Sequence, residues 1–343
     1  MEIIHCESRK DIAAWQDYVR CCPLATIFHT WPWRDIAAGV YGHPSFYLMA
    51  KQGDQVCGIL PLVLIKGPLF GASLVSMPFA DSGGICASTP EASARLVDAA
   101  HELGRSLRVH YVELRQSTLL GLGLPCRSDK VTMVLPLLAS EGEMWNRLPS
   151  ERRNKIRKGL NGNVTAELLG PEALDPFYDV YAETMRDLGS PGHSKLFFRT
   201  ICDVSPECIR IGLVRSMGKA IGAGICLLFK ERLLTEYSSL KRYRKLQPDI
   251  LLNWEAMKYG IAHGAREIDF GRSTIGSGTF EFKRNWGATP RQLYWQYILL
   301  NQASIPHVSA DNPRYGVLIE IWKRIPVPLA KKIGPVLRRS ISA

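Results

Sequence analysis

The sequence predicts an α/β protein in which one arrangement of strands and helices occurs twice along the chain. Residues 46–65 and 210–229 each contain two apolar segments joined by a short polar turn with a glycine. In both places a segment with helical periodicity follows, and then a short strand. Such an internal repeat indicates two related units. We therefore expect two mixed sheets, each covered by helices.

Length and composition agree with two folded domains. The chain has 343 residues, about twice the usual domain size. Its 46% hydrophobic and 22% charged residues are ordinary for globular proteins and exclude wholly disordered, collagen-like or coiled-coil chains. The longest apolar runs, such as 57–65 and 221–229, are about half of a membrane span. The first residues lack the basic start and apolar core of a signal peptide, so we expect a cytoplasmic protein.

The two repeated hairpins are predicted from their turns. Gln52-Gly53-Asp54 and Met217-Gly218-Lys219 each separate two apolar segments, and a further glycine, Gly58 or Gly222, lies early in the second segment. A glycine-containing turn between two β-prone segments is typical of a β-hairpin.

A helix and a strand are predicted after each hairpin. Residues 92–107 and 250–263 have apolar side chains at a spacing near 3.6, and Pro248 suits a helix start. Residues 111–117 and 267–273 then form short strands. Aligned by position, these strands pair similar residues: Val112 with Ile268, Glu113 with Asp269, Leu114 with Phe270 and Ser117 with Ser273.

A basic segment lies between the two copies. Residues 151–158 contain five Lys or Arg side chains, and Ser150 before them suits a helix N-cap. These cations would lie on all sides of a helix. Two interpretations stay open: a solvated helix between domains, or a cationic surface for phosphate or nucleic acid.

The C-terminal residues 315–343 mix apolar and basic side chains. No acidic residue follows Glu320, whereas six Lys or Arg residues do. This composition favours a segment that lies on an anionic membrane, and the alternative is a segment that packs on its domain. Pro326, Pro328 and Pro335 argue against one long amphipathic helix. We expect domains at 1–145 and 146–305, with 306–343 as a basic amphipathic tail.

The charge of the whole chain favours anionic partners. Forty-three Lys and Arg against 32 Asp and Glu leave a net charge of +11. Nine cysteines without a Cys-x-x-Cys pair are interpreted as buried or free thiols, and eight histidines show no metal-ligand spacing. No metal site is predicted. Signatures such as Gly-x-Ser-x-Gly, the P-loop and His-Glu-x-x-His are missing from the sequence.

Residues 234–287 hold most of the candidate site. Tyr237 and Ser239 end a strand with hydroxyl groups, and Arg244 lies in a basic loop before a helix, where orphan N–H groups favour anions. Asp269 and Arg272 lie at the end of the next strand.

A glycine-rich segment and then an aromatic and basic segment follow that strand. Phe282, Lys283 and Trp286 are candidates for stacking on a ligand or stabilising its charge. The alternative for Phe282 and Trp286 is that they anchor the hydrophobic core.

These motifs together resemble the FemAB branch of the GNAT superfamily, over nearly the whole chain and most strongly over 205–290. The resemblance rests on Gly-x-Gly-Ile, a basic loop, Pro-x-x-Leu-Leu-x-Trp-x-Ala, Asp-Phe-Gly-Arg-Ser and Phe-Lys-x-Asn-Trp-Gly. It implies two tandem GNAT-like domains and transfer of amino acids from aminoacyl-tRNA to peptidoglycan precursors. The segment 322–335 is similar to a subgroup associated with exosortase/PEP-CTERM and exopolysaccharide systems.

The resemblance also implies roles for single residues. Phe282-Lys283 matches a pair that lines the family's reaction site, and a fixed lysine would stabilise the oxyanion of acyl transfer. Lys283 and Asp269 are the expected catalytic residues. The expected substrate-binding residues are Trp33, Arg34, Asp81, Tyr237, Ser239, Arg244, Arg272, Phe282 and Trp286.

The expected donor is aminoacyl-tRNA, and acyl-CoA is the second choice. The loop 241–248 lacks the glycines with which ordinary GNAT enzymes wrap a pyrophosphate, and no tightly bound cofactor is expected. Expected partners are a phosphorylated or lipid-linked cell-envelope precursor, tRNA, and the anionic inner-membrane surface through residues 315–343. Two alternatives remain: a non-catalytic, membrane-associated accessory protein of exopolysaccharide or surface-protein assembly, and an acyl-CoA-dependent N-acetyltransferase.

Overall fold

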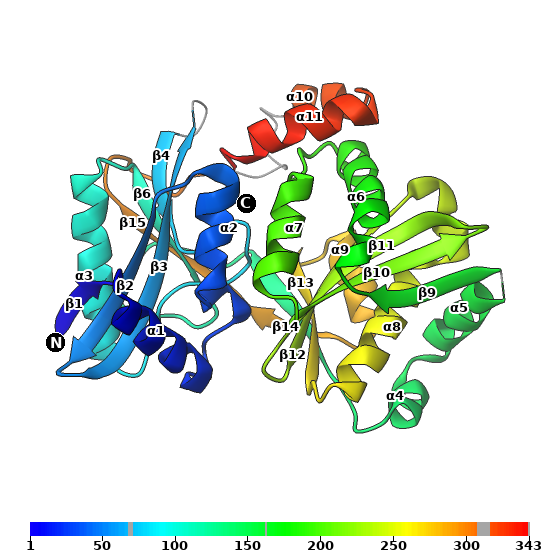
Figure 1. The fold of residues 1–343 in the computed structure, drawn as a ribbon, viewed down its shortest axis with the longest axis horizontal. Helices are drawn as coiled ribbons and strands as arrows, with labels where there is room; N and C mark the ends of the chain where they lie inside the picture. Colours follow the sequence, from blue (N-terminus) through cyan, green and yellow to red (C-terminus); the bar gives the residue numbers. More distant parts are fainter. Residues whose placement is uncertain (68–70, 162, 307–315, 342–343) are drawn as a thin grey trace. The chain divides into compact units, whose positions relative to one another are not determined.

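The computed structural model describes residues 1–67, 71–161, 163–306 and 316–341. The chain divides into two compact units, each built on one mixed sheet (Figure 1). The first unit comprises Met1–Lys130, Gln292–Ser309 and Val336–Ala343, and the second comprises Val131–Arg291 and Ala310–Pro335. The predicted α/β class with two tandem units is confirmed.

The first unit has a sheet in the order β1-β2-β3-β4-β6-β15-β7, with β5 paired to β3. Its strands are β1 (Glu2–His5), β2 (Ser45–Gln52), β3 (Gln55–Gly67), β4 (Gly71–Val75), β5 (Cys86–Ala87), β6 (Tyr111–Gln116), β7 (Cys126–Arg127) and β15 (Tyr294–Leu299). Its helices are α1 (Arg9–Cys21), η1 (Ile27–His29), α2 (Pro32–Tyr41) and α3 (Pro90–Ser106).

Helices cover both faces of this first sheet. Leu62 and Leu64 of β3 pack into the core shared with α3, whereas Val63 and Ile65 pack with Ala37 of α2. The alternation follows from the strand period of two, which sends successive side chains to opposite faces. Figure 1 shows α3 on one side of these strands and α2 on the other.

The second unit has a sheet in the order β14-β8-β13-β12-β11-β10-β9. Its strands are β8 (Lys130–Pro136), β9 (Val164–Leu169), β10 (Ile209–Ser216), β11 (Lys219–Phe229), β12 (Arg232–Ser239), β13 (Glu267–Thr274) and β14 (Thr289–Gln292). Its helices are α4 (Glu141–Arg147), α5 (Ser150–Leu160), η2 (Pro171–Ala173), α6 (Leu174–Leu188), α7 (Lys195–Val204), η3 (Lys241–Leu246), α8 (Pro248–Ala262), α9 (Gly278–Arg284), α10 (Gly316–Trp322) and α11 (Val327–Arg338).

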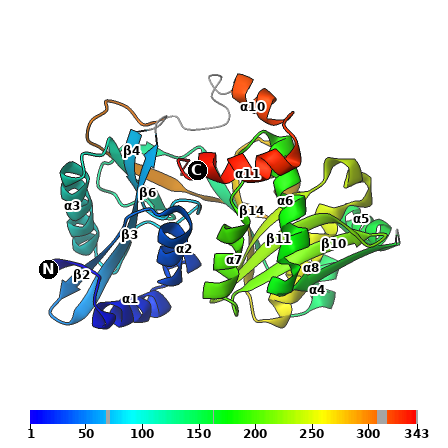
Figure 2. The same ribbon diagram turned by 45° about the horizontal axis from the view of Figure 1, so that its top comes forward.

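The predicted repeat of hairpin, helix and strand is present in both units. The hairpins β2–β3 and β10–β11 each contain a register shift, between Ala50 and Lys51 in one and between Val214 and Arg215 in the other. After the hairpin, α3 leads to β6 and α8 leads to β13; β6 pairs in parallel with β4, and β13 pairs in parallel with β12. The second sheet is crossed by α6 on one face (Figure 2).

The recurring glycine of the hairpin lets the helix approach the sheet closely. A Cβ atom added at Gly58 would lie 3.0 Å from Cδ1 of Leu96 on α3. A Cβ atom added at Gly222 would lie 2.7 Å from Cβ of Pro248 on α8. A distance of 2.7 Å is too short for a real Cβ atom, so packing requires glycine at position 222, whereas at position 58 a Cβ atom would be tight and Leu96 would have to shift.

Two strands, β8 and β15, do not pair in the same sheet as the strand that precedes them in the chain. β8 follows β7 in the chain but pairs in the second sheet, next to β13. β15 follows β14 but pairs in the first sheet, next to β6. The unit boundaries therefore fall at Lys130/Val131 and Arg291/Gln292, whereas the sequence suggested 145/146 and 305/306. Local periodicity locates a strand but says nothing about its partner.

Two further details differ from the expectations. Ser150 is the first residue of α5 and not its N-cap, which is Pro149. In the tail, α11 continues through Pro335, although that residue cannot donate a helical hydrogen bond. The prolines do separate α10 from α11. Among the described residues, no helix has the length and apolarity needed to span a bilayer.

Candidate functional site

The candidate site of the second unit lies where β12 and β13 separate. The two parallel strands pair from Arg232–Glu267 to Leu234–Asp269. Both strands continue beyond this last described pair, to Ser239 and Thr274. Two strands that stop pairing within a sheet expose backbone groups on their facing edges. Two of the candidate site residues, Asp269 and Arg272, lie at this end of β13.

Asp269 marks the point at which the strands separate. The residue is 6% exposed, and one carboxylate oxygen accepts hydrogen bonds from the hydroxyl of Thr132 and, at 2.9 Å, from the N–H of Gly271. The other oxygen lies 3.9 Å from a guanidinium nitrogen of Arg232. These contacts fix the end of β13 and give Asp269 a positioning role in this arrangement.

Lys283 lies on α9 and reaches back to the end of β13. Its ammonium donates hydrogen bonds to the backbone carbonyls of Gly271 and Arg272, both at 2.9 Å. The helix that carries Lys283 begins at Ser277, whose hydroxyl accepts a hydrogen bond from the N–H of Phe280. A positive charge is thus held in a defined position beside the separating strands.

The side chains next to Lys283 in sequence face a buried arginine. The guanidinium of Arg152 lies 5.4 Å from the ring centre of Phe282 and 5.5 Å from that of Trp286. Its Nε donates to the carbonyl of Asn285 at 3.1 Å. Burial lowers the pKa of Arg152, which is only 3% exposed. The contacts tie α5 to the segment that carries Lys283.

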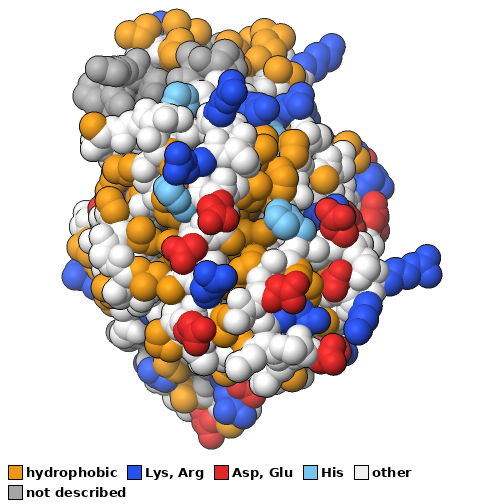
Figure 3. Space-filling model, turned by 90° about the vertical axis from the view of Figure 1, so that its left-hand side faces the viewer, with side chains coloured by type: hydrophobic (Ala, Val, Ile, Leu, Met, Phe, Trp, Pro, Cys, Tyr) orange, Lys and Arg blue, Asp and Glu red, His pale blue; other side chains and the backbone are white. Residues whose placement is uncertain are grey.

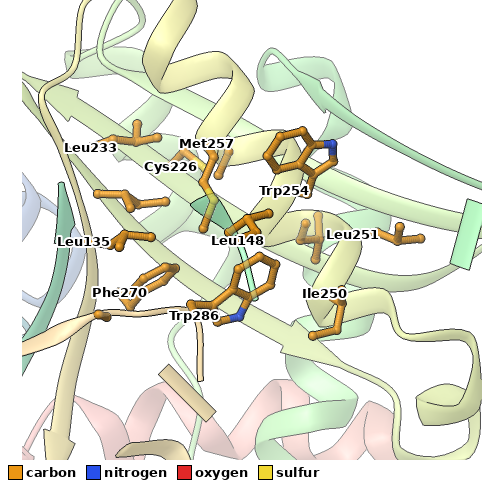
Figure 4. Packing of buried hydrophobic residues seen from close by; sticks show 14 of the residues in the cluster. Leu135, Leu148, Cys226, Leu233, Ile250, Leu251, Trp254, Met257, Phe270 and Trp286 are labelled. Atoms are coloured by element: carbon orange, nitrogen blue, oxygen red, sulfur yellow. The ribbon is translucent and has the colours of Figure 1, made fainter. Parts of the chain in front are cut away.

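Trp286 lies in the core of the second unit. It is 1% exposed and packs with residues from α8, β8 and β13 (Figure 4). Phe282 is half-buried and packs against the same core. This placement accounts for Trp286 as a core anchor, the alternative that the sequence left open.

The basic loop precedes a helix, as expected. It forms η3, and Arg244 is exposed there. Gln247 then adopts a left-handed conformation with φ of 58° before α8 begins at Pro248. Tyr237 and Ser239 belong to β12, and their side chains lie outside the described part of the structure.

The candidate residues of the first unit have other surroundings. Trp33 is 4% exposed and lies edge-on to Phe28 at 4.8 Å, so it is a core residue. The guanidinium of Arg34 lies over the ring of Trp31 at 5.1 Å. The backbone carbonyl of Asp81 accepts a hydrogen bond from the indole of Trp295 at 3.2 Å.

In the first unit, the strand that corresponds to β13 is β6, and buried side chains occupy the surroundings of its end. Glu113, the repeat partner of Asp269, forms a buried ion pair with Arg115 at 2.7 Å. Arg115 also donates to the carbonyl of Ala80 at 2.6 Å and lies 4.3 Å from the ring centre of Trp295. A buried arginine and a tryptophan thus occupy this place, which favours the second unit as the reactive one.

Three contributors to the site lay outside the sequence-based assignment. Thr132 comes from β8, and nothing in its local sequence relates it to Asp269. Arg232 opens β12 and pairs with both Glu267 and Asp269. Arg152 belongs to the basic segment 151–158, for which the sequence allowed either a solvated helix or a ligand-binding surface. Because Arg152 is buried, its side chain fits neither interpretation. In the described part of the chain, no group of three or more His, Cys, Asp or Glu side chains is arranged to hold a metal ion.

Comparison with known proteins agrees with this description. Residues 150–284 match the model of the acetyltransferase (GNAT) domain family. Among curated proteins, none matches the chain in sequence. The crystal structure of FemX is similar, with a TM-score of 0.69 and 16% identity over 93% of this chain and 100% of FemX.

Two further solved structures share the two-unit fold. A tandem GNAT protein from the clavulanic acid biosynthesis pathway has a TM-score of 0.57 and 11% identity over 89% of this chain and 99% of its own. L-PGS from Bacillus licheniformis has a TM-score of 0.55 and 13% identity over 94% of this chain and 98% of its own. Residues 150–284 thus match an acetyltransferase (GNAT) domain, and the chain as a whole shares the two-unit fold of FemX and of the tandem GNAT protein.

Proposed function

We propose that this protein transfers an aminoacyl group from aminoacyl-tRNA to an amine of a phosphorylated or lipid-linked cell-envelope precursor. The observation that carries the proposal is the ammonium of Lys283, held by the carbonyls of Gly271 and Arg272 where β12 and β13 separate. This lysine belongs to the Phe-Lys pair on which the sequence resemblance to aminoacyl-transferring enzymes rests.

The chemistry that we propose requires a fixed positive charge. The acceptor amine attacks the ester carbonyl of the donor, a C–N bond forms, and the carbonyl oxygen becomes an oxyanion. When this intermediate collapses, the C–O bond to the tRNA ribose breaks, and the proton lost by the amine goes to the ribose oxygen. The ammonium of Lys283 would stabilise the oxyanion without having to move.

The basic side chains support anionic substrates. Arg244 is exposed on η3, just before α8, and a helix N-terminus adds favourable N–H groups to its charge. The same loop contains no glycine and is folded as η3, which favours tRNA over acyl-CoA because close wrapping of a pyrophosphate needs glycine. We place the reaction at the inner face of the cytoplasmic membrane, where a lipid-linked acceptor would be found.

A transfer assay tests the proposal. Purified protein is given charged tRNA or acetyl-CoA as donor, with a nucleotide-linked or lipid-linked amino acceptor. Lys283→Ala should lower kcat by roughly 100- to 1,000-fold, the usual effect of losing one oxyanion-stabilising group. Lys283→Arg should retain more activity because it keeps the charge.

Arg284→Ala is the matched control. Arg284 neighbours Lys283 on α9 but is exposed and pairs with Glu281. A thermal melt shows whether each variant folds. Equal kcat for Lys283→Ala and wild type would overturn the role of Lys283. If only acetyl-CoA supports transfer, the donor is acyl-CoA and not aminoacyl-tRNA. If folded wild-type protein is inactive with both donors, the enzyme proposal fails and the non-catalytic accessory role is favoured.

A further inference from the structure

Exposed hydrophobic side chains gather on the last two helices. Among the described residues, α10 and α11 carry seven large hydrophobic side chains that are exposed to solvent. They are Val317, Leu318, Ile321, Leu329, Ile333, Val336 and Leu337. Contiguous exposed apolar surface of this kind marks a binding surface more often than scattered single residues do.

The helix α11 turns its large side chains outward. Leu329, Ile333, Val336 and Leu337 follow the spacing of a single helical stripe, with Val336 69% exposed. Next to the stripe around the helix, Ala330 is buried, and a Cβ atom at residue 334 would lie 3.2 Å from the carbonyl oxygen of Gly192. Small residues therefore make the contact with the protein, and the apolar stripe is left outside.

Contacts to α6 hold the tail in this orientation. The ammonium of Lys331 forms an ion pair with Asp179 at 2.5 Å. The guanidinium of Arg186 donates to the backbone carbonyl of Ile325 at 2.9 Å, between α10 and α11. These contacts hold the start of α11 and the segment before it on the second unit, so this part of the tail is not a detached peptide.

Positive charge lies beside the apolar stripe. Lys332 on α11 and Arg339, directly after the end of this helix, are both exposed. Arg324 is also exposed, and no acidic residue follows Glu320. Figure 3 shows hydrophobic side chains with Lys and Arg beside them at the top of one face of the molecule.

We propose that the exposed face of α10 and α11 binds the surface of an anionic phospholipid bilayer. The apolar side chains would insert at the headgroup boundary, and Lys332 and Arg339 would contact lipid phosphates. Charge complementarity selects this occupant, because the exposed acid of α10, Glu320, is paired with Lys323, and α11 carries basic side chains and no acid. If the proposed function is correct, binding to the bilayer would bring the protein close to a lipid-linked acceptor.

Vesicle sedimentation with the full chain tests this surface. The protein should sediment with phosphatidylglycerol–phosphatidylcholine vesicles and remain in solution with phosphatidylcholine alone. A Leu329→Ser, Ile333→Ser, Val336→Ser variant should bind at least about tenfold more weakly, because apolar burial supplies part of the binding. Lys332→Gln and Arg339→Gln should each cost about fivefold, the effect of one cation near an anionic surface.

The matched control changes three exposed hydrophobic residues elsewhere, Leu119→Ser, Leu196→Ser and Met217→Ser. This variant should bind vesicles as the wild type does. Equal weakening by the control, or no sedimentation of the wild type, would overturn the proposal. If the wild type instead forms a dimer that vesicles do not affect, and the α11 variant loses this dimer, the face binds a second copy of the chain and the membrane proposal is wrong. No donor or acceptor is present, so failure here is independent of failure in the transfer assay.

Discussion

The hydroxyl of Thr132 donates a hydrogen bond to the carboxylate of Asp269, which lies 137 residues further along the chain. Thr132 reaches this position because β8 pairs next to β13, and not with the strands that precede it in sequence. The same carboxylate accepts the N–H of Gly271, whose carbonyl binds Lys283. One exchanged strand thus supports the backbone that positions the candidate catalytic lysine.

Replacing Thr132 by valine should lower the free energy of unfolding by about 1.5–3 kcal/mol. The change keeps the volume but removes a buried hydrogen bond to a charged group. Chemical denaturation measures the effect. Thr200→Val is the control, because the Thr200 hydroxyl bonds a helix carbonyl at an exposed site. A loss no larger than that of the control would mean that the contact with Asp269 does not support the fold.

Replacing Gly222 by alanine should destabilise the protein by about 1–3 kcal/mol. The new methyl group would meet Pro248 at 2.7 Å and force α8 away from β11. Gly39 lies within α2 with no atom near its missing Cβ, so Gly39→Ala should instead stabilise by up to about 1 kcal/mol. Thermal melts of the two variants should shift in opposite directions; a shared direction would contradict the packing argument.

Cys22 should react as a thiolate at neutral pH. A hydrogen bond from the Cys86 thiol lowers the pKa of Cys22 to about 6, against the opposing effect of burial and with help from the N–H groups of Leu24 and Ala25. Alkylation of Cys22 by iodoacetamide, followed by peptide mass spectrometry, should rise to half its maximal rate near pH 6. Cys86→Ala should move this midpoint upward, because alanine removes the hydrogen-bond donor that stabilises the thiolate.

The same peptide maps contain an internal comparison. Burial, with Glu207 nearby, raises the pKa of Cys208 to about 11, so its alkylation should stay slow up to high pH. The linkage has a definite sign: the folded protein favours the Cys22 thiolate, and this contribution to stability is full above pH 9 and lost as pH falls toward 6. A Cys22 midpoint near 9 would contradict both statements.

The repeat could be predicted because its signals are local. Glycine in the turns, apolar alternation in the strands and helical spacing in 92–107 and 250–263 depend on residues close together in sequence. The structure places α3 and α8 at these positions and confirms the hairpins. Gly58 and Gly222, noted only as a repeated pattern, turned out to be sites where a helix approaches the sheet.

The candidate site was predicted less completely. Lys283 and Asp269 do lie near one another in the fold, since both contact Gly271. Trp286 and Trp33 are core residues, and their aromatic character alone could not tell packing from ligand binding. The roles of Lys283 and of the substrate-binding residues remain predictions for the transfer assay.

The sequence by itself determined the two α/β units, the Phe-Lys pair and the absence of acidic residues after Glu320, because each depends on residue type and short-range spacing. Only the tertiary structure decided that β8 and β15 change sheets, that Thr132 holds Asp269, and that α11 turns its apolar stripe outward. Strand pairing and helix orientation arise from contacts between distant segments, and periodicity shows that a face is apolar without showing what covers it.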